Sequence, residues 1–181
     1  MRKETKNKLT NFTLDVLDLF LGIPESLIYA FDRGEFYRIL QGMQTDKILT
    51  CSNISRIISN FKKSGYIETT KDNLGESIRF TNKAKLAIID RLAERTESDA
   101  KNRFVSFDIP EPLKSNRDGF RRTIKRMGFR QIQKSLWVCN RNIGNLVELA
   151  AVEYKVENYV VYIASNNSNI DDHIKDVLKN D

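Results

Sequence analysis

The feature that most restricts the possible folds is an alternation of strand and helix patterns in the C-terminal half. Short runs rich in apolar and aromatic residues predict strands at 103–109, 129–133, 135–139 and 159–164. Apolar residues at helical spacing predict helices at 113–127 and 143–154. The order βαββαβ is that of a ferredoxin-like fold, so we predict an antiparallel sheet with both helices on one face.

This arrangement leaves the other face of the sheet open. A unit of about 80 residues with an uncovered apolar sheet face tends to pair with another copy. The sequence therefore predicts a homodimer. Residues 167–181 are expected to form a tail or a short helix, in which the apolar residues are Ile170, Ile174, Val177 and Leu178.

The segment RTESDAKN, at 95–102, is polar and has no apolar periodicity, so it is the predicted domain boundary. We place an N-terminal domain at 1–97 and the ferredoxin-like domain at 101–166. The N-terminal domain should begin with a helix carrying Phe12, Val16, Leu17 and Phe20. A short helix opened by Pro24 and another that ends near Gly42 should follow.

The next helix is predicted by an apolar stripe at i, i+3, i+4 and i+7, with Ser52 as its N-cap. The stripe consists of Ile54, Ile57, Ile58 and Phe61. The opposite face carries polar and basic side chains and no carboxylate. A carboxylate there would repel a polyanion. These residues are Asn53, Ser55, Arg56, Ser59, Asn60, Lys62 and Lys63.

Gly65 should end this helix, and YIETT and ESIRF then flank the turn 72–75 of a predicted hairpin. A capped helix over 82–95 follows. Helix, hairpin, helix is the order of a winged helix-turn-helix, in which one helix enters the major groove and the wing lies along the DNA backbone. The candidate DNA contacts are Asn53, Ser55, Arg56, Asn60, Lys62 and Lys63 in the helix, and Lys71 and Arg79 in the wing.

Any amphipathic surface helix has a polar outer face, and that is the simpler interpretation of such a helix taken alone. Here the element order, the absence of acidic residues and the SGYIE exit together favour DNA binding. The predicted class is therefore α+β, with an N-terminal winged helix-turn-helix and a C-terminal ferredoxin-like domain.

The helix predicted at 113–127 is strongly basic. Within 114–134 only Asp118 is acidic, whereas the basic residues are Lys114, Arg117, Arg121, Arg122, Lys125, Arg126, Arg130 and Lys134. One interpretation is an ordinary solvated face. The other is a track for DNA phosphates, with Arg117, Arg121, Arg122 and Lys125 as contacts, each adding to the salt dependence of binding.

Composition excludes several classes of function. The chain has 181 residues, 40% apolar and 30% charged, which indicates a globular protein, and its net charge of +6 suits a nucleic-acid partner. His173 is the single histidine, which excludes a zinc site built on several histidines and disfavours a Ser-His-Asp triad. Cys51 and Cys139 are far apart and have no metal-ligand spacing, so we expect reduced thiols.

The sequence has no apolar run of 18 residues, and its basic start lacks the apolar core of a signal peptide. We therefore expect a cytoplasmic protein with no membrane-spanning helix.

The pieces SFDIPE, RRTIKRMGF and RQIQKSLWV resemble the small dimeric subunit of the CRISPR adaptation integrase. The whole chain is more similar to transcriptional repressors of the phenylacetate-catabolism type (PaaX-like), which place a winged helix before a domain of this fold. In these repressors and in this chain, FDIPE, a basic helix, GF and S-x-WV follow in the same order. Those repressors usually carry a further C-terminal domain, so the resemblance implies a short form whose regulatory input differs.

The resemblance to the adaptation subunit gives Asp108 a candidate role. In that family the aspartate ending the first strand lies near the dimer axis, where two copies can share Mg²⁺. Carboxylate oxygens suit this cation, which can activate water beside a phosphate. Glu111 is the only acidic neighbour in sequence. The alternative is that Asp108 caps a turn or the following helix. Ser135 could bond a phosphate or the partner's Asp108, and Trp137 is expected in the core or the dimer interface.

Three functions remain open on the sequence alone. The first is a dimeric, sequence-specific DNA-binding transcriptional regulator of the repressor type. The second is a metal-dependent nuclease that uses Asp108, with Mg²⁺ at the dimer axis. The third is a non-catalytic scaffold that holds double-stranded DNA for an integrase partner of the CRISPR-adaptation kind. In the first and third, no cofactor is required.

Overall fold

The structure, a computed structural model, describes residues 13–21, 31–42, 51–72 and 75–179. The chain divides into two compact units, Met1–Ile88 and Ile89–Asp181, each of which is described by itself. This division lies before the polar segment 95–102, which was the predicted domain boundary. Strand β4 begins at Ser98 and takes up the second half of that segment.

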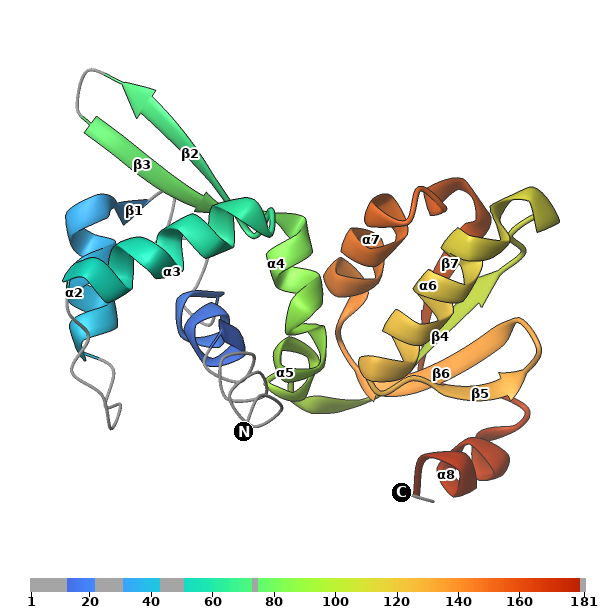
Figure 1. Cartoon of the computed structure of the whole chain (residues 1–181). Helices are drawn as coiled ribbons and strands as arrows, with labels where there is room; N and C mark the ends of the chain where they lie inside the picture. Colours follow the sequence, from blue (N-terminus) through green and yellow to red (C-terminus); the bar gives the residue numbers. More distant parts are fainter. Residues whose placement is uncertain (1–12, 22–30, 43–50, 73–74, 180–181) are drawn as a thin grey trace, which may run out of the picture. The chain divides into compact units, whose positions relative to one another are not determined.

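The N-terminal unit combines helices with a small antiparallel sheet in the order β1-β3-β2 (Figure 1). After a helix over 13–21 its elements are β1 (Phe31–Asp32), α2 (Arg33–Gly42), α3 (Cys51–Lys63), β2 (Ile67–Asp72), β3 (Gly75–Phe80) and α4 (Asn82–Ala87). The predicted hairpin is present as β2 and β3. The short strand β1, which pairs with β3, was not predicted, and the helix expected from Pro24 lies outside the described residues.

Aromatic and aliphatic side chains from three helices and the hairpin form the core of this unit. The rings of Phe20 and Phe36 stack with centroids 4.5 Å apart, and Phe80 of β3 lies 5.3 Å from Phe20. From α3, Ile54 and Phe61 are buried in this core. The apolar stripe predicted for α3 therefore faces inward, and its polar residues lie on the other side.

Two details of the predicted helices were wrong. Helix α3 begins at Cys51, so Ser52 lies inside its first turn and is not the N-cap. The helix expected over 82–95 is divided into α4 and α5 (Ile89–Glu94), with a break at Ile88. Thr81 caps α4, because its Oγ1 accepts a hydrogen bond from the Ala84 backbone over 3.3 Å.

The C-terminal unit confirms the predicted βαββαβ order. Its elements are α5, β4 (Ser98–Phe107), α6 (Lys114–Arg126), β5 (Arg130–Gln133), β6 (Leu136–Arg141), α7 (Gly144–Glu153), β7 (Val160–Ser165) and α8 (Asp171–Lys179), with 3-10 turns at Glu111–Leu113 and Glu157–Tyr159. The sheet is antiparallel with strand order β5-β6-β4-β7, the order of a ferredoxin-like fold.

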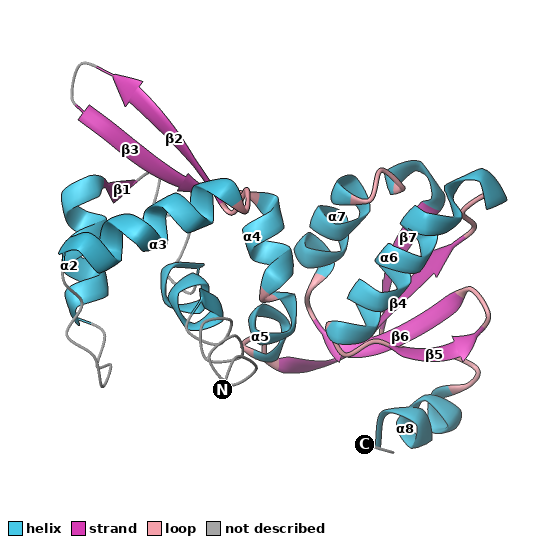
Figure 2. Ribbon diagram, in the orientation of Figure 1, coloured by secondary structure: helices cyan, strands magenta, loops and turns pink. Residues whose placement is uncertain are grey.

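Helices α6 and α7 cover one face of this sheet (Figure 2). Phe107 of β4 meets Phe120 of α6 edge to face at 5.5 Å. The two helices approach closely at Gly119, where an added Cβ atom would lie 2.4 Å from the Tyr154 ring. Trp137 is buried in the sheet, as expected for a core residue.

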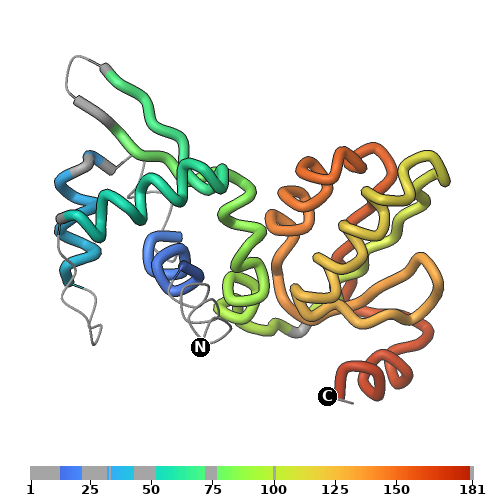
Figure 3. The backbone as a smooth tube through the Cα atoms, in the orientation of Figure 1, coloured from blue at the N-terminus to red at the C-terminus, as the bar shows by residue number. Residues whose placement is uncertain are grey.

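The expectation of an uncovered opposite face was wrong in part. Helix α8 returns to lie beside β5 (Figure 3), and its Ile174 packs against Phe104 and Val138 on that face. Residues 167–181 were expected to form a tail or a short helix, and their apolar residues were not assigned a surface to cover. The uncovered part of this face therefore lies away from α8, toward β7.

Candidate nucleic-acid interface

The outer face of α3 carries the side chains that the sequence assigned to DNA. Arg56, Asn60 and Lys63 are exposed, and Asn53 is half-buried. These four residues are separated by three, four and three positions, so they form one stripe along a helix. The 13 residues of α3 include no aspartate or glutamate. The stripe is therefore positive and rich in hydrogen-bond donors.

Ser55, also assigned to DNA, has a different environment. It is half-buried, and its hydroxyl lies 2.6 Å from the hydroxyl of Tyr37 on α2, at hydrogen-bond distance. This bond fixes α3 against α2. Ser55 is thus positioned to orient the helix, whereas Arg56 projects from the outer face.

Lys62 connects α3 to the hairpin. Its Nζ atom donates a hydrogen bond of 2.7 Å to the Oγ1 atom of Thr69 on β2. Gly65, at a φ of 69°, makes the reversal between helix and strand possible, because residues with a side chain rarely adopt this conformation. The helix and the hairpin are consequently joined both through the chain and through a side-chain bond.

The hairpin does not bring its two candidate residues to one face. Side chains alternate along a strand, so Lys71 shares a face with Thr69 and Ile67. Arg79 lies directly opposite Glu68 on the other face. Lys71 is therefore on the α3 side of the hairpin, and Arg79 has a carboxylate beside it.

Acidic residues outside the predicted basic segment pair with several cations of α6. Arg117 donates to a Glu111 carboxylate oxygen over 3.0 Å and to the Ile109 carbonyl over 3.2 Å. Lys114 lies 3.7 Å from the same carboxylate group. The hydrogen bond from Arg117 is the main cause that lowers the pKa of Glu111, and the charge of Lys114 adds to it. Glu111 thus compensates two cations of the basic segment, of which Arg117 is a predicted phosphate contact.

Two further cations of α6 also have partners. Arg126 donates to Asp90 of α5 over 2.9 Å. Arg121 donates to the Lys134 carbonyl over 3.2 Å, and its guanidinium carbon lies 5.8 Å from the centre of the Trp137 ring. Arg122 and Lys125 are exposed. The count of acidic residues within 114–134 missed the carboxylate partners, because Asp90 and Glu111 precede that segment.

Asp108 lies at the end of β4 and is exposed. Its backbone N–H donates to the Tyr159 carbonyl over 3.1 Å. The following turn and α6 have Pro110 and Leu113 at their N-cap positions, with no capping side chain, so Asp108 does not cap either of them. Within the described ranges, no three His, Cys, Asp or Glu side chains form a group able to hold a metal ion.

Ser135 is exposed in the turn between β5 and β6. Its carbonyl oxygen accepts a 3.2 Å hydrogen bond from the backbone N–H of Phe107. This bond places Ser135 beside Phe107, the last residue of β4, which directly precedes Asp108 in the chain.

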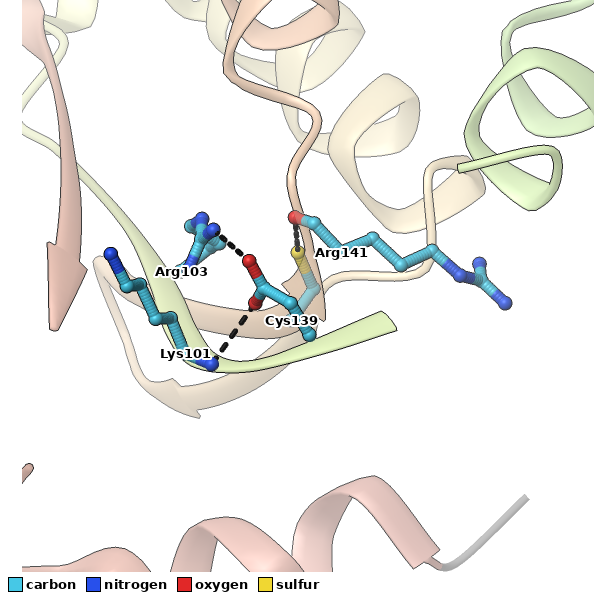
Figure 4. Close-up of polar contacts among 5 residues, drawn as sticks. Lys101, Arg103, Cys139 and Arg141 are labelled. Atoms are coloured by element: carbon cyan, nitrogen blue, oxygen red, sulfur yellow. Dashed lines mark hydrogen bonds and ion pairs between the residues drawn. The ribbon is translucent and has the colours of Figure 1, made fainter. Parts of the chain in front are cut away.

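A polar cluster around the buried side chain of Arg103 on β4 was not predicted from the sequence (Figure 4). The side chain of Arg103 is 4% exposed, and its Nη2 atom lies 2.5 Å from the Asp99 carboxylate. Asp99 also accepts a 3.0 Å hydrogen bond from the Lys101 backbone, which is the main cause that lowers its pKa. A basic residue at the start of a predicted strand gives no signal of burial, because such residues are mostly exposed.

Cys139 and Tyr162 lie close to this guanidinium. The Cys139 thiol donates to the Arg141 carbonyl at 3.5 Å, and burial raises the pKa of the thiol to about 11. Burial also raises the pKa of Tyr162, against the opposing effect of the Arg103 charge. The cluster belongs to the packing of the sheet under α7, and Cys139 is a free buried thiol, as predicted for a reduced cysteine.

None of the helices in the described part of the chain is both long enough and apolar enough to span a bilayer. No curated protein and no solved structure matches the chain. Residues 95–177, which extend from the end of α5 almost to the end of α8, match the family model of the PaaX protein central Cas2-like domain. Over these residues the chain is therefore similar to the PaaX family.

Proposed function

We propose that this protein is a dimeric, sequence-specific DNA-binding transcriptional regulator of the repressor type. The observation that carries the proposal is the acid-free stripe on α3, which projects beside a hairpin tied to the same helix. Helix α3 and the hairpin β2–β3 correspond to the recognition helix and the wing of a winged helix-turn-helix. The similarity of residues 95–177 to the PaaX family, whose members are generally transcriptional regulators, supports this proposal.

In this account α3 lies in the major groove. Arg56 occupies the middle of the stripe, and an arginine there can donate two hydrogen bonds to the O6 and N7 atoms of a guanine. Asn53 and Asn60 suit the N6 and N7 atoms of an adenine. Lys63, near the end of the helix, supplies charge to a phosphate.

The wing would contact the DNA backbone through one face. Lys71 shares its face with Thr69, which is bonded to α3, and in this account Lys71 is the wing residue that contacts the phosphate nearest this helix. Arg79 is opposite Glu68, and the negative charge of this carboxylate weakens the attraction of Arg79 for a phosphate. Lys71 should therefore contribute more to binding than Arg79.

A substitution of Arg56 tests the proposal. Arg56→Ala should weaken binding to the preferred duplex at least about fivefold, because one bidentate guanine contact contributes about 1–3 kcal/mol. Lys175→Ala is the matched control, since it removes one positive charge from an exposed position on α8. Fluorescence anisotropy at one stated salt concentration measures both. Equal affinity of the Arg56 variant and the parent would refute the role of α3.

A non-catalytic DNA scaffold is the second candidate, and the Cas2-like description of the matched domain favours it. Here the exposed cations of α6, Arg122 and Lys125, would hold duplex DNA for a partner enzyme. Replacing both by alanine should then reduce the salt slope of binding by about two units, whatever the DNA sequence. In the regulator account the same double variant keeps its sequence preference, so the two functions can be separated.

A further inference from the structure

Two large apolar side chains remain exposed on strand β7. Val161 is 55% exposed and Ile163 is 48% exposed. Their cross-strand neighbours on β4 are Ser106 and Phe104, and Phe104 packs against α8. Val161 and Ile163 therefore lie on the sheet face opposite α6 and α7, beside the part that α8 covers.

Strand β7 is also an edge of the sheet. It stands last in the order β5-β6-β4-β7, and no strand among the described residues pairs with its outer side. Edge strands of natural proteins are usually protected from pairing by charged residues, proline or a covering element. The sequence of β7, VVYIAS, contains neither a charge nor a proline. The other edge, β5, has α8 beside it and carries Arg130.

We propose that β7 pairs antiparallel with β7 of a second copy, so that two ferredoxin-like units share one continuous sheet. A neutral strand meets its own copy without like-charge repulsion, and its outward N–H and C=O groups find partners in the other copy. The proposal rests on the proposed function in one respect, because two DNA half-sites require two copies. It names the surface that joins them.

Side-chain alternation fixes the register. Around a two-fold axis perpendicular to the sheet, directly opposed residues must point to the same face. An axis at Tyr162 meets this condition, pairs β7 from Val160 to Ala164, and sets Val161 opposite Ile163 of the partner subunit. Both exposed side chains are then buried in cross-strand pairs, each of which contributes favourably to strand association.

Charge substitutions test both the surface and the register. The parent should elute with twice the mass of its 21.0 kDa chain in size-exclusion chromatography with light scattering. Val161→Glu alone and Ile163→Lys alone should each elute as monomers, because a charge would be buried against an apolar side chain. A mixture of the two variants should form a heterodimer, since the register places the new glutamate opposite the new lysine.

A matched control is Val152→Lys on α7, an equally exposed valine at 49%, which should leave the dimer intact. Circular dichroism of each variant shows whether its fold is kept. A parent that is monomeric at every concentration would overturn the proposal. So would folded Val161→Glu and Ile163→Lys variants that remain dimers, or a mixture that stays monomeric.

Failure of the interface and failure of the proposed function are distinguishable. If Val161→Glu is a monomer that still binds a single half-site through Arg56, the interface and the DNA-binding proposal both stand. If the parent is a dimer that these variants dissociate but it binds no duplex, the interface stands and the regulator account fails.

Discussion

The Nζ atom of Lys62 lies 2.7 Å from the Oγ1 atom of Thr69, so the last turn of α3 is bonded to the first strand of the hairpin. This bond sets where the hairpin lies relative to the outer face of the helix. It also engages Lys62, one of the cations that the sequence assigned to DNA. The two roles of Lys62, as a tie and as a charge, can be separated by substitution.

Lys62→Met should lower DNA affinity and reduce the salt slope of binding by about one unit, because a phosphate contact is lost. Thr69→Val removes the bond and keeps the charge, so it should leave the salt slope unchanged. Its effect on the free energy of unfolding should not exceed about 1 kcal/mol, since the bond is exposed. Titrations at several salt concentrations measure both slopes. A slope that falls equally in the two variants would contradict separate roles.

Gly119→Ala should destabilise the C-terminal unit. The added Cβ would lie 2.4 Å from the Tyr154 ring. Two hydrogen bonds hold Tyr154 in place: Asn116 donates to its backbone carbonyl over 2.7 Å, and its hydroxyl lies 3.0 Å from the hydroxyl of Thr123. Overpacking costs about 1–3 kcal/mol, more than the gain of about 1 kcal/mol in helix propensity. Urea denaturation gives the free energy of unfolding.

The control is Gly42→Ala at the end of α2, where an added Cβ would have no atom of the described residues within 4 Å. That variant should be as stable as the parent or more stable. A Gly119 variant that unfolds at the same urea concentration as the parent would show that α6 and α7 can move apart without cost.

Lys155→Gly should stabilise the protein by up to about 1 kcal/mol. Lys155 follows α7 with a φ of 55°, a conformation that costs a side-chain-bearing residue about 1–2 kcal/mol and glycine almost nothing. The surrounding bonds, from Lys155 N to Val152 O at 3.0 Å and from Val156 N to Ala151 O at 2.9 Å, are made by the backbone and should persist. Glu153→Gly, within α7, should instead lose about 1 kcal/mol. Thermal unfolding of both variants checks the opposite signs.

The Cys139 thiol should make stability fall at alkaline pH. Its pKa is about 11 in the folded protein and near 8.5 in an unfolded chain, so the unfolded state loses its proton first as pH rises. The contribution of the protonated thiol to the free energy of unfolding is complete below about pH 8 and is lost progressively between about pH 8.5 and 11. In a Cys51→Ser background, Cys139→Val should remove this part of the decline. Identical pH profiles with and without Cys139 would contradict the buried, protonated thiol.

The fold of the C-terminal unit could be predicted because its apolar residues follow two clear periods. Ile124 and Phe120 mark the inner side of α6, and both are fully buried. The two-residue strand β1 was too short to leave a pattern. The break at Ile88 has neither glycine nor proline; there the backbone N–H of Ile88 bonds to Lys85 three residues earlier and ends α4.

Long-range contacts limited the prediction of the site. Periodicity indicated that Ile174 lies on an apolar stripe, but not that this stripe would cover Phe104. Charge counting along the chain could not pair Arg126 with Asp90, 36 residues earlier. The outer face of α3 was easier to predict, because the apolar stripe that orients it lies within the helix itself.

The central claim, that α3 reads DNA sequence in a dimer, is tested most directly by selecting duplexes bound from a random pool at one stated salt concentration. The account predicts enrichment of a two-fold symmetric motif whose half-sites lie one helical turn, about 34–36 Å, or a multiple of it apart. Arg56→Ala should abolish preference at one position in each half-site. A pool that shows no enriched sequence, with retention that depends only on duplex length, would contradict the claim.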